Sequence, residues 1–254
     1  MRFLNLLFIF FISFFALPSA GAAAPVGSIN VAAASDLTFA LKEIAAGFEK
    51  DNGVKVRLSF GSTGMLAKQI ESGAPFDVFF AADLRYIDGL KKALVVMPDS
   101  VTLYAEGRIV LAVREASSTG ITGLKDLLKP GVKRIAIANP AHAPYGRAAM
   151  EALKKEGLWE KVRDKLVYGE NIRQTLQFIE TGNAEAGIIA LSVAGVPGIK
   201  YTEIDSRLHN PIDQAAGVVA ASKEKESAEA FIKYVKGPAG RLILKKYGFV
   251  LPRK

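Results

Sequence analysis

Four segments of the chain share one hydrophobic pattern. In each, a short apolar run passes into small or hydroxyl-bearing residues and then directly into a sequence with helical periodicity. The apolar run predicts a buried strand and the periodic sequence a helix. Each helix would begin with backbone N–H groups that have no partner within the helix, at the positive end of its dipole. The four segments are residues 29–35, 56–64, 135–146 and 166–172.

The first of two rounds of strand and helix follows residue 28. The predicted first helix ends at Asn52-Gly53, a common helix terminator. A strand–helix–strand–helix order favours a sheet rich in parallel pairs, with helices on both faces. The predicted strands are residues 29–34, 54–60 and 77–81, and the predicted helices are residues 37–51, 65–72 and 87–93.

A second round begins near Arg108. It contains predicted strands at residues 109–113, 135–138 and 166–168, predicted helices at residues 124–128, 147–157 and 173–181, and a short apolar segment at residues 186–190. The last part of the chain predicts a strand at residues 217–221 and helices at residues 225–236 and 239–247.

This organisation predicts an α/β protein with two units of about 100 residues each. No linker rich in Gly, Ser or Pro separates them, so we expect the chain to cross between the units on strands, near residues 106–108 and 215–218. Lobe I would then comprise residues 25–106 and 218–254, and lobe II residues 107–217. The C-terminal helices would pack on lobe I.

The first 24 residues have a different composition. Met1 and Arg2 precede an apolar run at residues 3–17, and small residues follow as far as Ala24. This order describes a secretory signal peptide, whereas a membrane span needs about 20 apolar residues. We therefore predict that residues 1–24 direct export and are removed. Ala20, Ala23 and Ala24 all fit as the residue before the cut.

The chain contains no cysteine. Disulfides, thiolate zinc sites and cysteine nucleophiles are therefore excluded. A lipid-anchored exported protein would also need a cysteine at its new N-terminus. We accordingly expect a soluble mature chain in the periplasm.

The net charge of +8 changes this picture little. The basic pairs, such as Lys91-Lys92 and Lys154-Lys155, stand at helical spacing beside apolar residues, which predicts solvated helix faces. Nucleic acid is not expected as a partner of an exported protein. Mild attraction of anions, or contact with a membrane partner, is the alternative use of this charge.

The residues at the predicted helix starts are the candidate ligands. Helix N-termini bind anions without Lys or Arg, so four of them brought together would form a neutral, donor-lined pocket for a small oxyanion. Ser35, the Ser62-Thr63 pair between two glycines, and the N–H of Tyr145 are candidates. Each also has a structural interpretation: Ser35 could cap a helix beginning at Asp36, and Asn171 with Gln174 resembles a capping box.

Catalytic and metal-binding chemistry find little support. A Ser–His–acid set would need His142 or His209, the only two histidines, and neither stands in a nucleophile motif. Asp77, Asp83 and Asp88 lack a calcium-type loop, and Asp83 is expected to cap a helix near the lobe junction. We expect no enzymatic activity, no metal-ion site and no cofactor.

Several motifs together resemble the periplasmic molybdate-binding proteins of ABC transporters. The resemblance runs in order from about Ser28 to the C-terminus. The motifs are Ala-Ala-Ala-Ser at residues 32–35, Phe-Gly-Ser-Thr at 60–63, Gln-Ile-Glu-Ser-Gly-Ala-Pro at 69–75, Asp-Val-Phe-Phe-Ala-Ala-Asp at 77–83, Asn-Pro-Ala-His-Ala-Pro-Tyr-Gly at 139–146 and Tyr-Gly-Phe at 247–249.

The resemblance implies a two-lobed periplasmic binding protein fold of type II. Each lobe would be a mixed, mostly parallel sheet flanked by helices, with two crossover strands. Molybdate or tungstate would be held in the cleft by hydroxyl and N–H groups and delivered to a membrane permease by a monomer. The implied ligands are Ser35, the Ser62-Thr63 pair, and the N–H groups of Tyr145 and Ile172.

Two positions depart from the family pattern. The extra Asp36 leaves both Ala34 and Ser35 as candidates for the first ligand, and the choice between Ser62 and Thr63 is equally open. In one branch of the family a tyrosine hydroxyl after a Gly-Ile stretch completes the site, but Ala190 stands there in this chain. Either fewer side-chain donors hold the ligand, or another group replaces the tyrosine.

Three alternatives accompany this interpretation. A sulfate or phosphate carrier could share the architecture, and a phosphate carrier could use Asp36 as an acceptor for the proton that phosphate retains, although an acid in a first helical turn usually complements the helix dipole. An exported hydrolase or transferase is the alternative from another class. A binding protein that serves a sensor rather than a permease is the third.

Overall fold

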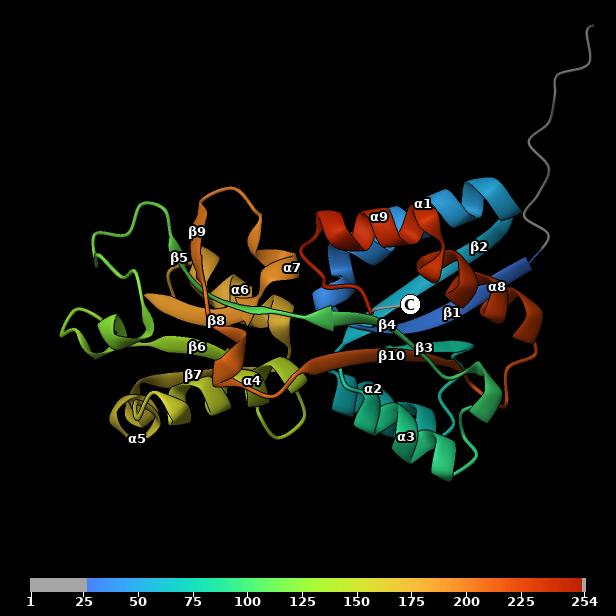
Figure 1. The fold of residues 1–254 in the computed structure, drawn as a ribbon, viewed down its shortest axis with the longest axis horizontal. Coiled ribbons are helices and arrows are strands. Elements are labelled where there is room, and N and C mark those ends of the chain that lie inside the picture. The colour runs from blue at the N-terminus through green and yellow to red at the C-terminus, as the bar shows by residue number, and fades with distance from the viewer. Residues whose placement is uncertain (1–26, 253–254) are drawn as a thin grey trace, which may run out of the picture.

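The computed structural model describes residues 27–252, and the predicted signal peptide lies outside this range. The described residues form two lobes side by side, each built on one five-stranded sheet (Figure 1). This arrangement confirms the predicted fold class. Within residues 27–252, no helix combines the length and the apolar character needed to cross a membrane.

The sheet of the first lobe has the strand order β2-β1-β3-β10-β4. β1 pairs in parallel with β2 and β3, while β10 is antiparallel to β3 and β4. One face is covered by α1, α8 and α9, and the other by α2 and α3 (Figure 1). The strands are β1 Gly27–Ala34, β2 Val54–Gly61, β3 Val78–Ala81, β4 Thr102–Gly107 and β10 Ile212–Val218; the helices are α1 Thr38–Asn52, α2 Thr63–Glu71, α3 Leu84–Lys92, α8 Lys225–Lys236 and α9 Pro238–Lys246.

The sheet of the second lobe has the order β7-β6-β8-β5-β9. β6 is parallel to β7 and β8, and β5 is antiparallel to β8 and β9. The strands are β5 Ile109–Arg114, β6 Ile135–Ala138, β7 Leu166–Gly169, β8 Ala186–Ala190 and β9 Ile199–Glu203; the helices are α4 Pro144–Lys155, α5 Trp159–Val162, α6 Ile172–Glu180 and α7 Leu191–Ala194. Short 3₁₀ turns lie at Ser35–Leu37, Pro98–Ser100, Leu124–Leu128, Arg163–Lys165 and Ser206–Leu208.

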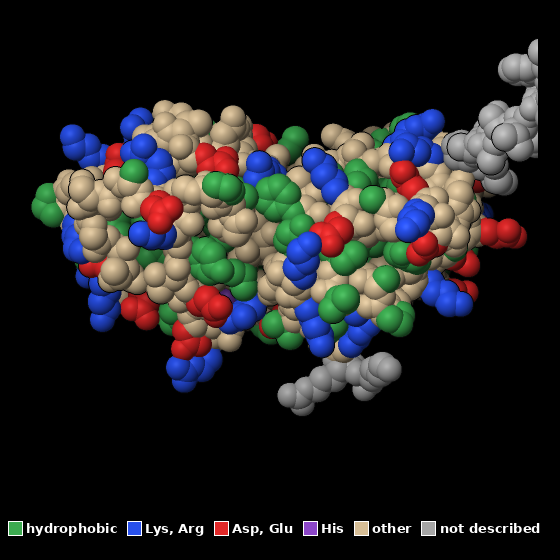
Figure 2. All heavy atoms as spheres, turned by 90° about the horizontal axis from the view of Figure 1, so that it is seen from above, with side chains coloured by type: hydrophobic (Ala, Val, Ile, Leu, Met, Phe, Trp, Pro, Cys, Tyr) green, Lys and Arg blue, Asp and Glu red, His purple; other side chains and the backbone are tan. Residues whose placement is uncertain are grey.

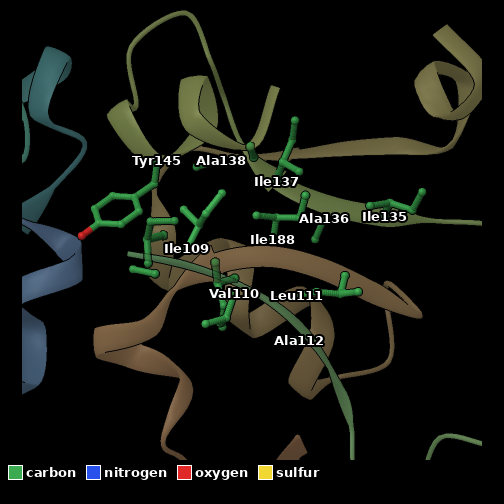
Figure 3. Close-up of a cluster of buried hydrophobic side chains, with 14 of the residues drawn as sticks. Ile109, Val110, Leu111, Ala112, Ile135, Ala136, Ile137, Ala138, Tyr145 and Ile188 are labelled. Atoms are coloured by element: carbon green, nitrogen blue, oxygen red, sulfur yellow. The ribbon is translucent and has the colours of Figure 1, made fainter. Parts of the chain in front are cut away.

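The core of the second lobe is a cluster of apolar side chains from β5, β6 and β8 (Figure 3). Tyr145 stands at the edge of this cluster, and its phenol oxygen points toward the ribbon of the first lobe, drawn in blue (Figure 3). The ring therefore packs in the second lobe, while the hydroxyl lies at the boundary with the first lobe.

The chain crosses between the lobes at two places. The first crossing runs from β4 through Arg108 into β5, as predicted. The second follows β9, between residues 204 and 211, which is earlier than the predicted crossing at residues 215–218. All of β10 pairs within the first sheet, although Ile212 at its start packs in the hydrophobic core of the second lobe. The polar residues Asp213 and Gln214 interrupt the apolar pattern at the start of this strand, so the start was not predicted, although Gln214 is buried.

Most other predicted elements lie within a few residues of the observed ones, and the C-terminal helices pack on the first lobe as predicted. The exceptions have physical reasons. Strands β4 and β9 were not predicted; both are edge strands, and β9 has largely exposed residues that lack an apolar run. Helix α3 begins at Leu84, three residues before the predicted start, since Asp83 caps it as expected by accepting from the N–H of Arg85 at 2.8 Å.

Gly146 allows α4 to begin directly against the end of β6. A Cβ at this position would overlap the backbone carbonyl of Ala138, whereas a Cβ on the exposed helical Gly89 would meet nothing within 4 Å. We expect Gly146→Ala to lower the free energy of unfolding by about 1–3 kcal/mol through overpacking. Gly89→Ala should raise it by about 0.5–1 kcal/mol. Urea unfolding of both variants checks this; equal stabilisation by both would contradict the close approach.

Candidate functional site

All five predicted ligand residues line one small pocket between the lobes, with a volume of about 10 Å³. Ser35 follows β1, Ser62 and Thr63 join β2 to α2, and Tyr145 and Ile172 lie in the first turns of α4 and α6. Helix starts at the ends of parallel strands meet at one edge of each sheet, and the two edges face each other. The lining contains no Lys or Arg. The role of these residues as ligands remains a prediction.

The N–H of Ile172 is directed across the lobe boundary by its own helix cap. Asn171 accepts from the N–H groups of Arg173 and Gln174 at 3.0 and 3.2 Å, which leaves the first N–H of α6 free. That group donates to Ser35 Oγ of the other lobe at 3.1 Å. The predicted capping box is wrong in one detail, because Gln174 Oε1 accepts from Glu170 N rather than from the cap residue.

Ser35 does not cap the first helix, contrary to its structural interpretation. The 3₁₀ turn at Ser35–Leu37 has no side-chain cap, and the Ser35 hydroxyl instead accepts from Ile172 N. Its proton remains available to a ligand. Ala34 also lines the pocket but offers no hydroxyl. These contacts favour Ser35 over Ala34 as the side chain that would hold an anion.

Ser62 and Thr63 occupy different environments. Ser62 Oγ donates to the backbone carbonyl of His142 across the boundary at 2.8 Å. Thr63 Oγ1 accepts from the N–H of Ala82 within its own lobe at 3.1 Å, which fixes the oxygen and leaves its proton free. Gly64, the next residue, also donates its N–H to the carbonyl of His142, at 3.0 Å. Thr63 is therefore the better-placed donor in this closed conformation.

Ser62 and His142 form a pair that the sequence did not predict. His142 Nδ1 lies 2.8 Å from Ser62 Oγ, and Nε2 lies 3.7 Å from Glu170 Oε2. Because the Ser62 proton points to a carbonyl, the imidazole Nδ1 acts as the donor to Oγ. A general base needs the opposite arrangement. The pair therefore connects the two lobes.

Asp36 stands in the first turn of a helical segment, as the dipole interpretation expected, but its side chain also has tertiary partners. Asp36 is buried, and its Oδ2 accepts from Tyr145 Oη at 2.9 Å and from Gln214 Nε2 at 2.7 Å. Tyr104 Oη donates to the Oε1 of Gln214 at 2.6 Å. The four side chains come from the 3₁₀ turn after β1, from α4, and from β4 and β10, the two strands of the first sheet that adjoin the crossings. The network therefore connects the two lobes to the hinge.

The charge state of Asp36 is set by its surroundings. Burial raises the pKa of this carboxyl to about 6, although the hydrogen bonds from Gln214 and Tyr145 act in the opposite direction. Asp36 Oδ1 is buried with no hydrogen-bond partner. Burial also raises the pKa of Tyr104 and of Tyr145 well above the usual value, so both phenols stay neutral.

Two further contacts join the lobes beside the pocket. Arg147 of α4 forms an ion pair with Asp83, at 2.6 Å between Nη2 and Oδ2, and donates to Tyr86 Oη at 3.0 Å. Arg173 of α6 lies over the ring of Phe39, 4.9 Å from its centroid. Burial alone would raise the pKa of Asp83, but hydrogen bonds from Arg85 and Arg147 outweigh it and lower the pKa.

Among residues 27–252, no group of three or more His, Asp or Glu side chains is arranged to hold a metal ion. On the face shown in Figure 2, Lys and Arg side chains are spread over both lobes among acidic and neutral ones. This distribution agrees with the prediction of solvated helix faces.

Two sheet-and-helix lobes, joined by two crossings and closing on a polar pocket, define a two-lobed solute-binding protein. Residues 29–250 match the family described as bacterial extracellular solute-binding proteins, and the chain belongs to this family.

The relatives within this group confirm the resemblance seen in the motifs. The chain is 41% identical to the molybdate-binding protein ModA of Azotobacter vinelandii over 90% of this chain and 92% of that protein. The solved structure of the periplasmic molybdate-binding protein of Azotobacter vinelandii aligns with a TM-score of 0.83 and 32% identity, covering 89% of this chain and all of that one. The sulfate-binding protein SubI of Mycobacterium tuberculosis shares the fold, with a TM-score of 0.75 and 17% identity over 88% and 86% of the two chains.

Burial of Asp36 makes the free energy of unfolding depend on pH. Its pKa in the folded protein, about 6, lies above the ordinary value of 3.8, so the folded state binds more protons between these values. The free energy of unfolding should therefore fall by about 3 kcal/mol as the pH rises from about 4 to above 6. Asp36→Asn, a neutral isostere, should escape this loss.

Urea unfolding at several pH values measures the difference. Asp36→Asn should approach wild type near pH 4 and exceed it at pH 8. The matched control is Asp213→Asn, at an exposed acid on β10, which should follow wild type throughout. A wild type that gains stability relative to Asp36→Asn across this range would contradict the assignment.

Proposed function

We propose that this protein binds molybdate, and the similarly shaped tungstate, outside the cytoplasm and delivers it to the permease of an ABC transporter. One observation carries the proposal: hydroxyl and N–H groups from the starts of four helical segments in two lobes line one pocket that lacks Lys and Arg. The identity to molybdate-binding relatives supports the choice of anion.

The chemistry of the anion fits such a lining. Molybdate at neutral pH is a fully deprotonated, divalent tetrahedral oxyanion, so it only accepts hydrogen bonds. Hydrogen bonds to charged groups contribute roughly 1.5–3 kcal/mol each. Six or seven of them, less the cost of dehydrating the anion and closing the lobes, would leave about 8–12 kcal/mol, or micromolar to nanomolar binding.

Binding would follow a hinge motion. The anion can enter only when the lobes separate, which breaks the cross-lobe hydrogen bonds Ile172–Ser35 and Tyr145–Asp36 and the Arg147–Asp83 ion pair. Ligand contacts from both lobes would then favour the closed form. In this proposal the permease recognises the closed form, the protein acts as a periplasmic monomer without enzymatic activity, and residues 1–24 serve as its export signal.

A phosphate-type carrier is the second candidate, and Asp36 is the observation that favours it. Monohydrogen phosphate carries a proton that a buried carboxylate could accept. Asp36 lines the pocket and its Oδ1 has no partner. The fold shared with a sulfate-binding protein does not choose between these anions.

A thermal-shift series against molybdate, tungstate, sulfate, phosphate and nitrate tests the class of ligand. An anion at 100 times its Kd should add about 2.7 kcal/mol of stability. We expect molybdate and tungstate to raise the melting temperature at micromolar concentrations and the other anions to have little effect. A larger shift with sulfate or phosphate would overturn the molybdate proposal.

The paired variant Ser62→Ala with Thr63→Ala tests the site. Loss of two hydroxyl donors should weaken molybdate binding at least tenfold, which corresponds to about 1.4 kcal/mol. Titration calorimetry measures the affinity. Ser72→Ala, at an exposed serine where α2 ends, is the control and should bind like wild type. Unchanged affinity of the paired variant would remove these residues from the ligand set.

A further inference from the structure

Asp36 is the one carboxylate in the lining of the pocket. Its side chain accepts hydrogen bonds from Tyr145 and Gln214 on Oδ2, while Oδ1 is buried without a partner. No Lys, Arg or His of residues 27–252 forms an ion pair with it. A charged carboxylate in such a place would repel a divalent anion strongly, because little water remains to screen the two.

Among the residues that the structure describes, no cation faces Asp36; its charged form is favoured only by neutral donors, namely Gln214, Tyr145 and the backbone N–H groups of Asp36 and Leu37. Tyr145 from α4, Tyr104 from β4 and Gln214 from β10 are neutral, and Ser192 from α7 donates to the Asp36 carbonyl at 2.8 Å. The nearby cations have other contacts: Arg147 pairs with Asp83, and Arg173 lies over Phe39. Protonation of Asp36 would remove the repulsion between this carboxylate and a divalent anion.

We propose that Asp36 takes up one proton when a fully deprotonated oxyanion binds, and that its O–H then donates a hydrogen bond to the anion. The step is balanced: one proton from solvent joins Oδ1, and no other bond changes. This inference rests on the proposed function of the pocket. It makes Asp36 a specificity-determining residue for anions that carry no proton of their own.

The geometry of Asp36 indicates which oxygen the proton would bind and what the resulting O–H would contact. Oδ2 already accepts two hydrogen bonds, so the proton belongs on Oδ1, which is buried without a hydrogen-bond partner in the closed conformation. An anion oxygen would supply that acceptor. The added donor would also fill the role left open by Ala190, where one branch of the family has a tyrosine hydroxyl. Because burial holds the pKa of Asp36 at about 6, protonation near neutral pH is inexpensive.

Calorimetric titration of the full mature chain with molybdate provides the test. At pH 8, paired buffers of different ionisation enthalpy should report close to one proton taken up per anion, falling toward half at pH 6. The wild-type affinity should weaken about tenfold for each pH unit above 6. Asp36→Asn should show no proton uptake, a flat pH profile between pH 6 and 8.5, and tighter binding than wild type at pH 8.5.

Asp213→Asn is the matched control and should keep the wild-type proton uptake and pH profile. Wild-type binding without proton uptake would overturn the inference and leave the proposed function intact, whereas absence of wild-type molybdate binding at every pH would overturn the proposed function itself. Phosphate binding by wild type that Asp36→Asn abolishes would show Asp36 acting as an acceptor, and would also overturn the inference. If Asp36→Asn does not fold, the number of protons that the wild type takes up per bound molybdate still tests the inference.

Discussion

The structure depends on one constraint: the backbone N–H groups at the starts of facing helices must find acceptors when the lobes close. Buried backbone donors are rarely left unpaired. In the closed conformation the lobes partly satisfy each other, as Ile172 N donates to Ser35 Oγ and Gly64 N donates to the carbonyl of His142. An oxyanion would offer stronger acceptors than these neutral oxygens. In the proposed function, anion binding would use the same donors as closure, so a bound ligand would control the relative position of the lobes.

Close approach of the lobes also requires small residues at particular places. A Cβ on Gly64 would lie 2.8 Å from both the carbonyl of His142 and the hydroxyl of Tyr86. A Cβ on Gly107, at the first crossing, would overlap the phenol of Tyr145. These glycines give the Tyr145 hydroxyl access to Asp36, and they let the loop before α4 rest against the start of α2. The contacts at the hinge, at the pocket and in the Asp36 network thus all require residues without a Cβ at Gly64 and Gly107.

Much of this could be predicted from the sequence, because strand ends followed by helix caps are local patterns. The helix starts, the Asn171 cap and the convergence of Ser35, Thr63 and Ile172 all follow from such patterns together with the family motifs. The network around Asp36 could not be predicted in the same way. Asp36 and Gln214 stand 178 residues apart, and each is an ordinary polar residue in its own segment. The start of β10 was missed for the same reason: a buried glutamine is recognisable only by its tertiary partners.

The separation of charge from the binding pocket has a functional consequence. The basic residues that give the chain its charge of +8 are distributed over the surface, where they can raise the local concentration of anions without touching a bound one. The pocket itself is lined by neutral donors and one titratable acid. A fixed cation there would hold any divalent anion in both open and closed states, and release to a permease would then be slow. In the proposed function, donors contributed by both lobes would bind an anion well only while the lobes are closed. Opening would divide the donor set between the lobes, so the geometry that permits tight binding would also permit release.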